Sequence, residues 1–350
     1  MSRFLSSRYA GLTEYVPGEQ PQDKQYIKLN TNESPYPPSP AVLEAINTAA
    51  VSQLNLYSDP DAKLLVNALA AQYGVGPENV FLSNGSDDIL NFAFMAFCDG
   101  GVKFPEITYG FYTVYAALHG VAYETPALRP DFSIDPSDYY NAGCTVVLAN
   151  PNAQTGVALP LTEIERIVHS NPDEVVVIDE AYVDFGGASA VPLTRQYDNL
   201  LVVQTFSKSR SMAGARLGFA IGPKGLIADQ NKLKYSTNPY NLNRLTQLAG
   251  VAALREQSYY DENCRRIMET RQYTRDALTA LGFTCTDSQA NFLLARIDAM
   301  DGETLYRKLK DRGILVRHFS DPLITDWVRI TIGSQEQMET LVAVVKELVR

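Results

Sequence analysis

The segment TFSKSRSMAGARLG (205–218) sets a lysine and an arginine among hydroxyl-bearing and small residues. Lys208 stands next to Ser207, and Arg216 follows eight positions after the lysine. A lysine amine forms a Schiff base with an aldehyde, and the planar guanidinium of arginine suits a phosphate better than an ammonium does. The segment therefore predicts part of a site for a phosphorylated ligand that carries an aldehyde.

The elements that would hold this segment alternate along the chain. Short apolar, β-branched runs bounded by turn residues predict strands buried on both faces, and the pieces between them have helical spacing. This alternation is typical of an α/β domain with a mainly parallel sheet covered by helices. The predicted strands are 79–83, 145–150, 174–180, 200–205 and 216–222, and the predicted helices include 40–50, 61–74, 86–98 and 161–170.

The pattern changes near residue 243. Residues 243–282 predict a long helix, and short strands and a closing helix follow, as in a smaller α+β domain. We therefore expect an amino-terminal arm (1–40) that packs on the small domain, a large cofactor-binding domain (41–242) and a small domain (243–350). The strands predicted for the small domain are 291–297, 314–319 and 327–333, and its closing helix is 337–350.

Polar residues follow the predicted strands where the chain leaves the sheet. In open α/β sheets, ligands bind at the carboxyl ends of the strands. Gly85 permits close backbone approach, and Ser86 and Asp87 open a helix whose free N–H groups could receive an anion. Taken alone, these residues are better explained as a plain helix cap. After the next run, Asn150 and Asn152 could donate to a ligand oxygen or form a turn.

An aspartate and a lysine follow adjacent strands. Asp179 ends one buried run, where a carboxylate must be paired or hydrogen-bonded, either to a protein cation or to a protonated ring nitrogen. Thr205, Ser207 and Lys208 follow the next run. Pyridoxal phosphate would use all of these groups: the lysine for a Schiff base, the aspartate for its ring nitrogen, and the hydroxyls with Arg216 for its phosphate.

Composition and motifs argue against several other classes of protein. The 350-residue chain has a formal net charge of −10, which is unlike a nucleic-acid-binding protein. The amino terminus lacks the apolar core of a signal peptide, and no run approaches the ~20 apolar residues of a membrane helix. Isolated cysteines predict buried thiols in the cytoplasm, and the scattered histidines predict no metal site. No glycine fingerprint for a dinucleotide follows a strand.

The order of motifs resembles the fold-type-I pyridoxal-phosphate aminotransferases, and within them most closely the histidinol-phosphate aminotransferase branch. The motifs are NGSDD, FPEITYGFY, NPNAQTG, VIDEAYVDF, TFSKSRSMAGARLGF, NFLLARI and VRITIG, and the resemblance runs from residue 12 to the carboxyl terminus. It implies an aspartate aminotransferase-like fold, with a mainly parallel sheet of the seven-stranded type between helices and a smaller α+β domain. The lysine–arginine block and DEAY are highly specific for the superfamily, whereas the substrate is marked less specifically.

The resemblance implies a role for each residue around the cofactor, pyridoxal 5′-phosphate. Lys208 forms the Schiff base and shuttles a proton, while Asp179 binds the ring nitrogen. Tyr182 binds the ring hydroxyl oxygen, and Tyr109 stacks on the ring. The residues expected around the phosphate are Gly85, Ser86, Asp87, Thr205, Ser207 and Arg216.

Two positions near the cofactor stay open. The family often has Asn-Pro-Thr-Gly where this chain has Ala-Gln-Thr-Gly (153–156), so the second contact to the ring hydroxyl oxygen goes to Asn152 or to a neighbour. Arg210, between Lys208 and Arg216, is either solvated or a second neighbour of the phosphate.

The resemblance also implies a substrate site and a partner. Arg329 resembles the arginine that takes the anionic end of the substrate, with Tyr15, Asn32 and Arg317 as helpers. Tyr57, in NLYSDPD, resembles a tyrosine that reaches the phosphate bound in the partner subunit, which implies a homodimer with shared sites.

The implied reaction is a transamination of histidine biosynthesis. Histidinol phosphate would give its amino group to 2-oxoglutarate, yielding imidazole acetol phosphate and glutamate. Threonine-phosphate decarboxylases and aromatic amino-acid aminotransferases share nearly all of these residues and stay as alternatives. A catalytically silent binding protein on the same fold is a more distant alternative, against which the intact Lys208, Asp179 and Arg216 argue.

Overall fold

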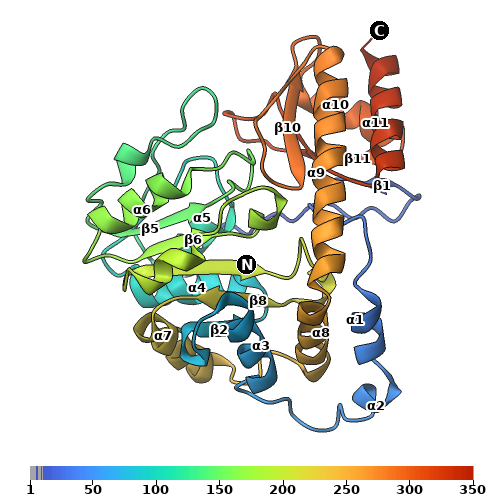
Figure 1. Cartoon of the computed structure of the whole chain (residues 1–350). Helices are drawn as coiled ribbons and strands as arrows, with labels where there is room; N and C mark the ends of the chain where they lie inside the picture. Colours follow the sequence, from blue (N-terminus) through green and yellow to red (C-terminus); the bar gives the residue numbers. More distant parts are fainter. Residues whose placement is uncertain (1–4, 7–8, 10, 350) are drawn as a thin grey trace.

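The structure is a computed structural model that describes residues 5–6, 9 and 11–349. The described chain forms a seven-stranded sheet, a four-stranded sheet and a two-stranded pair. Figure 1 shows strands of the large sheet such as β5 and β6 in green, and beside them a second lobe built from the orange and red carboxyl-terminal segments.

The large sheet has the strand order β2-β8-β7-β6-β5-β3-β4. Its neighbouring strands are parallel, except that β8 is antiparallel to both β2 and β7. This confirms the predicted mainly parallel sheet. In chain order, its strands are β2 (Val80–Ser83), β3 (Val102–Lys103), β4 (Tyr123–Glu124), β5 (Thr145–Ala149), β6 (Val176–Asp179), β7 (Leu200–Thr205) and β8 (Gly218–Ile221).

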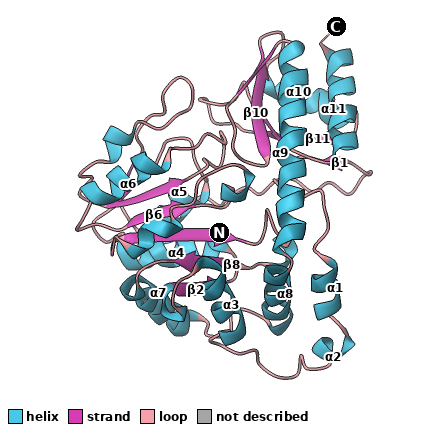
Figure 2. Cartoon of the chain, viewed as in Figure 1, coloured by secondary structure: helices cyan, strands magenta, loops and turns pink. Residues whose placement is uncertain are grey.

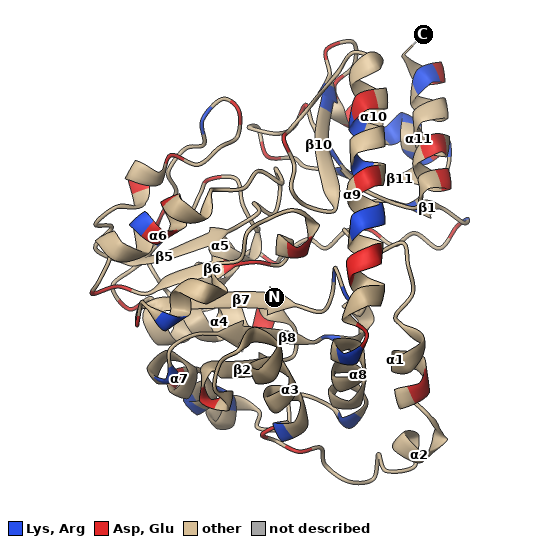
Figure 3. Ribbon diagram, in the orientation of Figure 1, with Lys and Arg blue, Asp and Glu red and all other residues tan. Residues whose placement is uncertain are grey.

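Helices cover both faces of the central strands. In β6, Val177 belongs to the apolar cluster that contains residues of α4 and α5, whereas Val176 and Ile178 belong to the cluster that contains residues of α3, α6 and α8. Figure 2 shows these helices in cyan around the magenta strands. In Figure 3 the strands labelled β5 and β7 carry no charge, while charged residues gather on outer helices such as α9 and α11. The apolar runs therefore form strands because both of their faces are buried.

Local signals define several helix ends. α3 ends at Gly74, whose φ of 62° is left-handed, and α11 begins after Ser334, whose side chain accepts the amide of Gln337. The single helix predicted over 40–50 is two short helices, because the backbone leaves helical geometry at Ile46. The α-helices are α1 (Pro40–Ala45), α2 (Thr48–Val51), α3 (Lys63–Tyr73), α4 (Ser86–Phe97), α5 (Phe111–His119), α6 (Leu161–Ser170), α7 (Lys224–Thr237), α8 (Arg244–Arg255), α9 (Gln257–Ala280), α10 (Gly302–Asp311) and α11 (Gln335–Leu348).

The four-stranded sheet has the order β12-β13-β10-β9 with antiparallel neighbours. Its strands are β9 (Phe283–Cys285), β10 (Phe292–Ile297), β12 (Arg317–His318) and β13 (Val328–Thr331). The strand predicted over 314–319 is divided, since β11 (Ile314–Leu315) leaves this sheet and pairs with β1.

The amino-terminal segment runs through the second lobe before it reaches the large sheet. β1 (Ile27–Lys28) pairs in parallel with β11, and Figure 1 shows it among the carboxyl-terminal elements. Beyond β1, the amide of Leu29 donates to the carbonyl of Leu315 at 2.8 Å, and the amide of Asn32 donates to Thr331 Oγ1 at 3.0 Å. The arm is therefore joined by backbone hydrogen bonds to the last strands of the chain.

The helix predicted over 243–282 is interrupted at Glu256, between α8 and α9. α8 packs against α1 and α3, whereas α9 packs against β9 and α11. The division into an arm and two domains stays a prediction, and these contacts favour a boundary near Glu256 in place of residue 243.

Strand register brings the predicted site residues to one edge. Asp179 lies in register between Ala149 of β5 and Val203 of β7. Gly218 lies between Ser83 of β2 and Thr205 of β7. The loops after β2, β6 and β7 therefore leave the sheet side by side.

Candidate active site

A cavity of about 200 Å³ lies at the carboxyl ends of β6 and β7. Its walls come from six parts of the chain that are distant in sequence. The predicted residues that line it are Ser86, Asp87, Tyr109, Asp179, Tyr182, Thr205, Ser207, Lys208 and Arg216. Five further lining residues were not predicted: Thr31, Glu33, Ala153, Ala181 and Ala213.

Lys208 is the one lysine that lines this cavity. Its Nζ donates to the carbonyl of Thr31 at 3.2 Å and lies 5.8 Å from the ring centre of Tyr182. Burial lowers the pKa of Lys208 to about 8, and the positive charge of Arg329 acts in the same direction, whereas Glu33 opposes it. The amine is therefore available in its neutral, nucleophilic form near neutral pH.

Asp179 is buried and receives two hydrogen bonds. Tyr112 donates to Oδ2 at 2.8 Å, and the amide of Ala181 donates to Oδ1 at 3.2 Å. Burial raises the pKa of Asp179 to about 6, while both hydrogen bonds lower it. No described cation pairs with this carboxylate, so the chemistry of the site favours a protonated ring nitrogen as its partner.

Arg216 and the first turn of α4 form one end of the cavity. Arg216 Nη2 lies 2.8 Å from Asp87 Oδ2, and its backbone φ is 54°. A Cβ on Gly85 would lie 2.5 Å from Arg216 Nη2, and the backbone φ of 87° at this position favours glycine. The N–H groups at the start of α4 and the guanidinium together suit an anion.

The hydroxyls of Thr205 and Ser207 lie at the same end. Thr205 Oγ1 donates to Ser207 Oγ at 2.9 Å and accepts the amide of Ser207 at 3.1 Å. Both residues are buried and line the cavity. The turn after β7 therefore presents two polar oxygens next to Lys208.

Two tyrosines flank the cavity. Tyr109 donates to Asp87 Oδ1 at 2.7 Å, and Tyr182 accepts a hydrogen bond from Asn32 Nδ2 at 3.0 Å. Burial raises the pKa of both phenols. Asn32 does not line the cavity, because Thr331 Oγ1 and Tyr182 engage its side chain.

Arg329 lies next to the cavity. Its Nη1 donates to the carbonyl of Ala153 at 2.9 Å and to Gln154 Oε1 at 3.0 Å. The guanidinium lies 5.2 Å from the ring centre of Phe292 and 5.4 Å from that of Phe319. Its Nε is buried without a hydrogen-bond partner among the residues described, which leaves a donor for a ligand.

The predicted helpers of Arg329 do not line the cavity. Tyr15 stacks on Phe111 with ring centres 4.1 Å apart and meets Tyr109 edge-on at 6.3 Å. Arg317 donates to the carbonyls of Pro17 (3.0 Å) and Val16 (2.8 Å). Both residues act on Arg329 electrostatically, and both hold the amino-terminal segment near the site.

Asn152 and Tyr57 also lie away from the cavity walls. The side-chain Nδ2 of Asn152 donates to the carbonyl of Ile107 at 2.9 Å, and its Oδ1 accepts the backbone amides of Gln154 and Thr155. These contacts hold the turn that carries Ala153. Tyr57 is 79% exposed, so its predicted contact in a partner subunit stays a prediction.

Three polar residues at or next to the cavity were not among those expected from the sequence: Tyr112, Thr31 and Glu33. Tyr112 lies within the motif TYGFY, which was used only for Tyr109, and Thr31 and Glu33 come from the arm. The expectation that Arg210 is solvated or near the phosphate is wrong, since it is 2% exposed and does not line the cavity.

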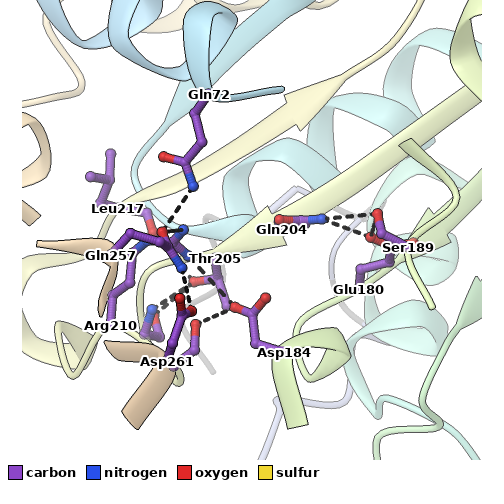
Figure 4. A network of polar contacts seen from close by, with 12 residues as sticks. Gln72, Glu180, Asp184, Ser189, Gln204, Thr205, Arg210, Leu217, Gln257 and Asp261 are labelled. Atoms are coloured by element: carbon purple, nitrogen blue, oxygen red, sulfur yellow. Dashed lines mark hydrogen bonds and ion pairs between the residues drawn. The ribbon is translucent and has the colours of Figure 1, made fainter. Parts of the chain in front are cut away.

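Arg210, itself buried, belongs to a polar network outside the cavity. It lies 3.6 Å from Asp184 and donates to Gln257 Oε1 at 3.2 Å, and Gln257 also contacts Gln72 and Asp261. Figure 4 shows this network between β7, α3 and the start of α9. The loop that carries Lys208 is thus attached through Arg210 and Gln257 to α3 and to the start of α9.

In the part of the chain that the structure describes, no group of three His, Cys, Asp or Glu side chains could hold a metal ion, and no helix is both long and apolar enough to span a membrane. All four cysteines are free thiols, three of them buried and Cys285 half-buried.

The cavity fits pyridoxal 5′-phosphate by the chemistry of its donors. Arg216, the α4 amides and two hydroxyls suit the phosphate, and Asp179, which also lines the cavity, suits the ring nitrogen. Lys208 supplies the amine for the aldehyde. A Cβ on Gly85 would crowd Arg216, the arginine that suits the phosphate.

Known proteins resemble the whole chain. Residues 24–345 match the family model "Aminotransferase class I and II". Histidinol-phosphate aminotransferases from Brachyspira hyodysenteriae and Marinomonas sp. are 47% and 49% identical, covering 100% and 99% of this chain and 100% of their own lengths. A crystal structure of histidinol-phosphate aminotransferase from Sinorhizobium meliloti with pyridoxal-5′-phosphate has a TM-score of 0.89 at 26% identity, over 100% of this chain and 99% of the other. The chain therefore belongs to the class I and II aminotransferases, within the branch of histidinol-phosphate aminotransferases.

Proposed function

We propose that the chain is a pyridoxal-phosphate-dependent aminotransferase that moves the amino group of histidinol phosphate to 2-oxoglutarate. The observation that carries the proposal is the single cavity in which Lys208, Asp179 and Arg216 meet. The full-length relatives named for this reaction support the choice of donor. When bound, pyridoxal 5′-phosphate supplies an electron sink for the bond that breaks at the substrate Cα.

Lys208 moves the proton of the reaction. Because its pKa is about 8, about a tenth of the amine is neutral at pH 7. The neutral Nζ would take the proton from the substrate Cα and later return a proton to C4′, the cofactor carbon that carries the aldehyde. The carbonyl of Thr31, 3.2 Å away, holds the amine on this side of the cavity.

The remaining residues bind and orient. Asp179 accepts the N–H of the cofactor ring, and Arg216 with Thr205 and Ser207 holds the phosphate. Arg329 takes the anionic end of either substrate, since its guanidinium accommodates the phosphate of the donor as well as a carboxylate of 2-oxoglutarate.

We further propose a cytoplasmic homodimer. Tyr57 stacks on Tyr240 with ring centres 4.4 Å apart, and both rings are exposed in the single chain. Leu54 and Leu56 nearby are also exposed, by 54% and 59%. An apolar surface of this kind favours burial against a second copy, which would bring Tyr57 to the partner's phosphate. The four free thiols suit a reducing compartment.

Replacement of Lys208 tests the proposal. Lys208→Ala should lower turnover at least about a thousandfold and abolish the visible absorbance of the lysine-bound cofactor, because no other lysine lines the cavity. The matched control is Lys346→Ala, which removes an exposed lysine of α11. Normal turnover by Lys208→Ala would overturn the proposal.

A panel of donors tests the substrate. Histidinol phosphate, phenylalanine, tyrosine and threonine phosphate are each supplied with 2-oxoglutarate, and glutamate formation is followed. We expect the highest kcat/KM with histidinol phosphate. A preference for phenylalanine or tyrosine would assign an aromatic aminotransferase, and release of carbon dioxide from threonine phosphate would assign a decarboxylase.

A further inference from the structure

We propose that Tyr112 is a positioning residue that holds the Asp179 carboxylate towards the cofactor ring and keeps it ionised. The inference rests on the proposed function, because it concerns the carboxylate that would bind the ring nitrogen. Tyr112 lies in the first turn of α5 and does not line the cavity. Its hydroxyl donates to Asp179 from outside the cavity wall.

Two hydrogen bonds hold the Asp179 carboxylate, which lines the cavity. Oδ2 accepts the Tyr112 hydroxyl at 2.8 Å, and Oδ1 accepts the Ala181 amide at 3.2 Å. Each carboxylate oxygen thus has one protein donor, and its remaining lone pairs are free for a donor in the cavity that Asp179 lines. The two hydrogen bonds set the orientation of the carboxylate before any ligand binds.

Tyr112 is itself fixed by aromatic packing. It is fully buried, and its ring lies 5.6 Å from that of Phe104, 6.2 Å from Phe94 and 5.8 Å from Tyr109. Burial and the neighbouring Asp179 charge raise the pKa of Tyr112 well above its usual value. The phenol therefore stays protonated and can act only as a donor towards Asp179.

The hydrogen bond also controls when Asp179 takes up a proton. Burial raises the pKa of Asp179 to about 6, and the Tyr112 hydroxyl is the largest influence that opposes it. The other ionisable groups that act on this carboxylate or respond to it are Asp87 of α4, Tyr115 of α5, Tyr182 after β6 and Lys208 after β7. Without the hydroxyl, protonated Asp179 would persist to higher pH and could not receive a protonated ring nitrogen without losing its proton.

The test compares cofactor binding by wild type and Tyr112→Phe across pH. The dissociation constant of pyridoxal 5′-phosphate is measured by absorbance from pH 5.5 to 9 on cofactor-depleted protein. We expect Tyr112→Phe to bind about threefold more weakly at pH 6.5 and about eightfold more weakly at pH 5.5, with the acid limb of its binding profile moved up by about one pH unit and near-normal affinity at pH 9. Phe keeps the ring volume, so circular dichroism and the melting temperature check that the fold is retained.

Tyr139→Phe is the matched control. Tyr139 is 1% exposed, and its hydroxyl has no hydrogen-bond partner among the described residues, so this variant removes a buried hydroxyl outside the site. A Tyr112→Phe profile that superimposes on those of Tyr139→Phe and wild type would overturn the inference, as would a loss of affinity that is uniform at all pH values. If wild type itself fails to bind the cofactor, or borohydride fails to trap it on Lys208, the proposed function falls instead.

Discussion

Two neighbouring carboxylates at the end of β6 have different tasks. Asp179 lines the cavity, whereas Glu180 points away from it into the protein. Glu180 accepts hydrogen bonds from Ser189 Oγ, the amide of Ala190 and Gln204 Nε2, at 2.6, 2.6 and 2.7 Å. Figure 4 shows the side chains of Ser189 and Gln204 around this carboxylate. Glu180 therefore ties the loop after β6 to β7, the strand that precedes Lys208.

The buried Glu180 carboxylate should make the free energy of unfolding depend on pH. Burial raises its pKa from an ordinary 4.5 to about 7, so the folded protein binds a proton more readily than the unfolded chain does. This contribution stabilises fully below pH 4.5 and is lost as the pH rises through 7, a change of about 3 kcal/mol. Urea unfolding of cofactor-depleted protein should show this fall in the free energy of unfolding as the pH rises. Glu180→Gln should remove the part of the fall that Glu180 causes.

Asp179 contributes to the same trend and is unchanged in that variant, so only the difference between the two proteins reports on Glu180. Glu339→Gln, an exposed change on α11, is the control and should leave the wild-type trend intact. Equal pH dependence in wild type and Glu180→Gln would contradict the assignment.

At the scale of elements, β8 lies between the two segments proposed to hold the phosphate, the start of α4 and the turn after β7. Gly218, its first residue, lies in register between Ser83 and Thr205. A Cβ there would lie 2.3 Å from the amide nitrogen of Ser86 and 2.4 Å from the carbonyl carbon of Gly85. Because these are backbone atoms, a side chain would push the start of α4 away from the strand.

Gly218→Ala should therefore destabilise the fold and displace the phosphate-binding amides. We expect a loss of about 2 kcal/mol in the free energy of unfolding and weaker binding of pyridoxal 5′-phosphate. Gly225→Ala in α7 is the control, since no atom lies within 4 Å of its added Cβ, and it should be neutral or stabilise by up to about 1 kcal/mol. If Gly218→Ala were as stable as wild type, β8 and the start of α4 could move apart without cost, contrary to this prediction.

How far the elements could be predicted depends on their length and burial. β5, β6 and β7 were predicted because each is a continuous apolar run of four to six residues. β3 and β4 were missed, since two-residue strands carry no period that a sequence pattern could reveal.

The residues of the site also differ in how far the sequence alone could predict them. Lys208 and Asp179 could be placed because they directly follow or end a strand, so the sheet alone brings them together. The contact of Tyr112 with Asp179 depends on how α5 packs across the sheet, and that of Thr31 with Lys208 depends on the path of the arm. Neither path has a local sequence signal.

At the scale of the whole molecule, the proposed homodimer predicts that two inactive variants restore each other. Co-expressed Lys208→Ala and Tyr57→Phe chains form mixed dimers in which one site has both the lysine and the partner's tyrosine intact. In the mixed dimers, half of the sites are then wild type. Activity of co-purified, differently tagged chains measures this, and activity no higher than the average of the two separate variants would contradict shared sites.

The path of the amino-terminal arm bears on the order in which the protein is completed during synthesis. Residues 27–32 form hydrogen bonds with partners at 291, 315 and 331, at the far end of the chain. Thr31, which holds Lys208, lies within this segment. The ribosome makes the arm first, yet the arm has nowhere to dock until the last strands emerge. The large sheet can form early, but a chain released short of residue 331 would lack the contacts that finish the site.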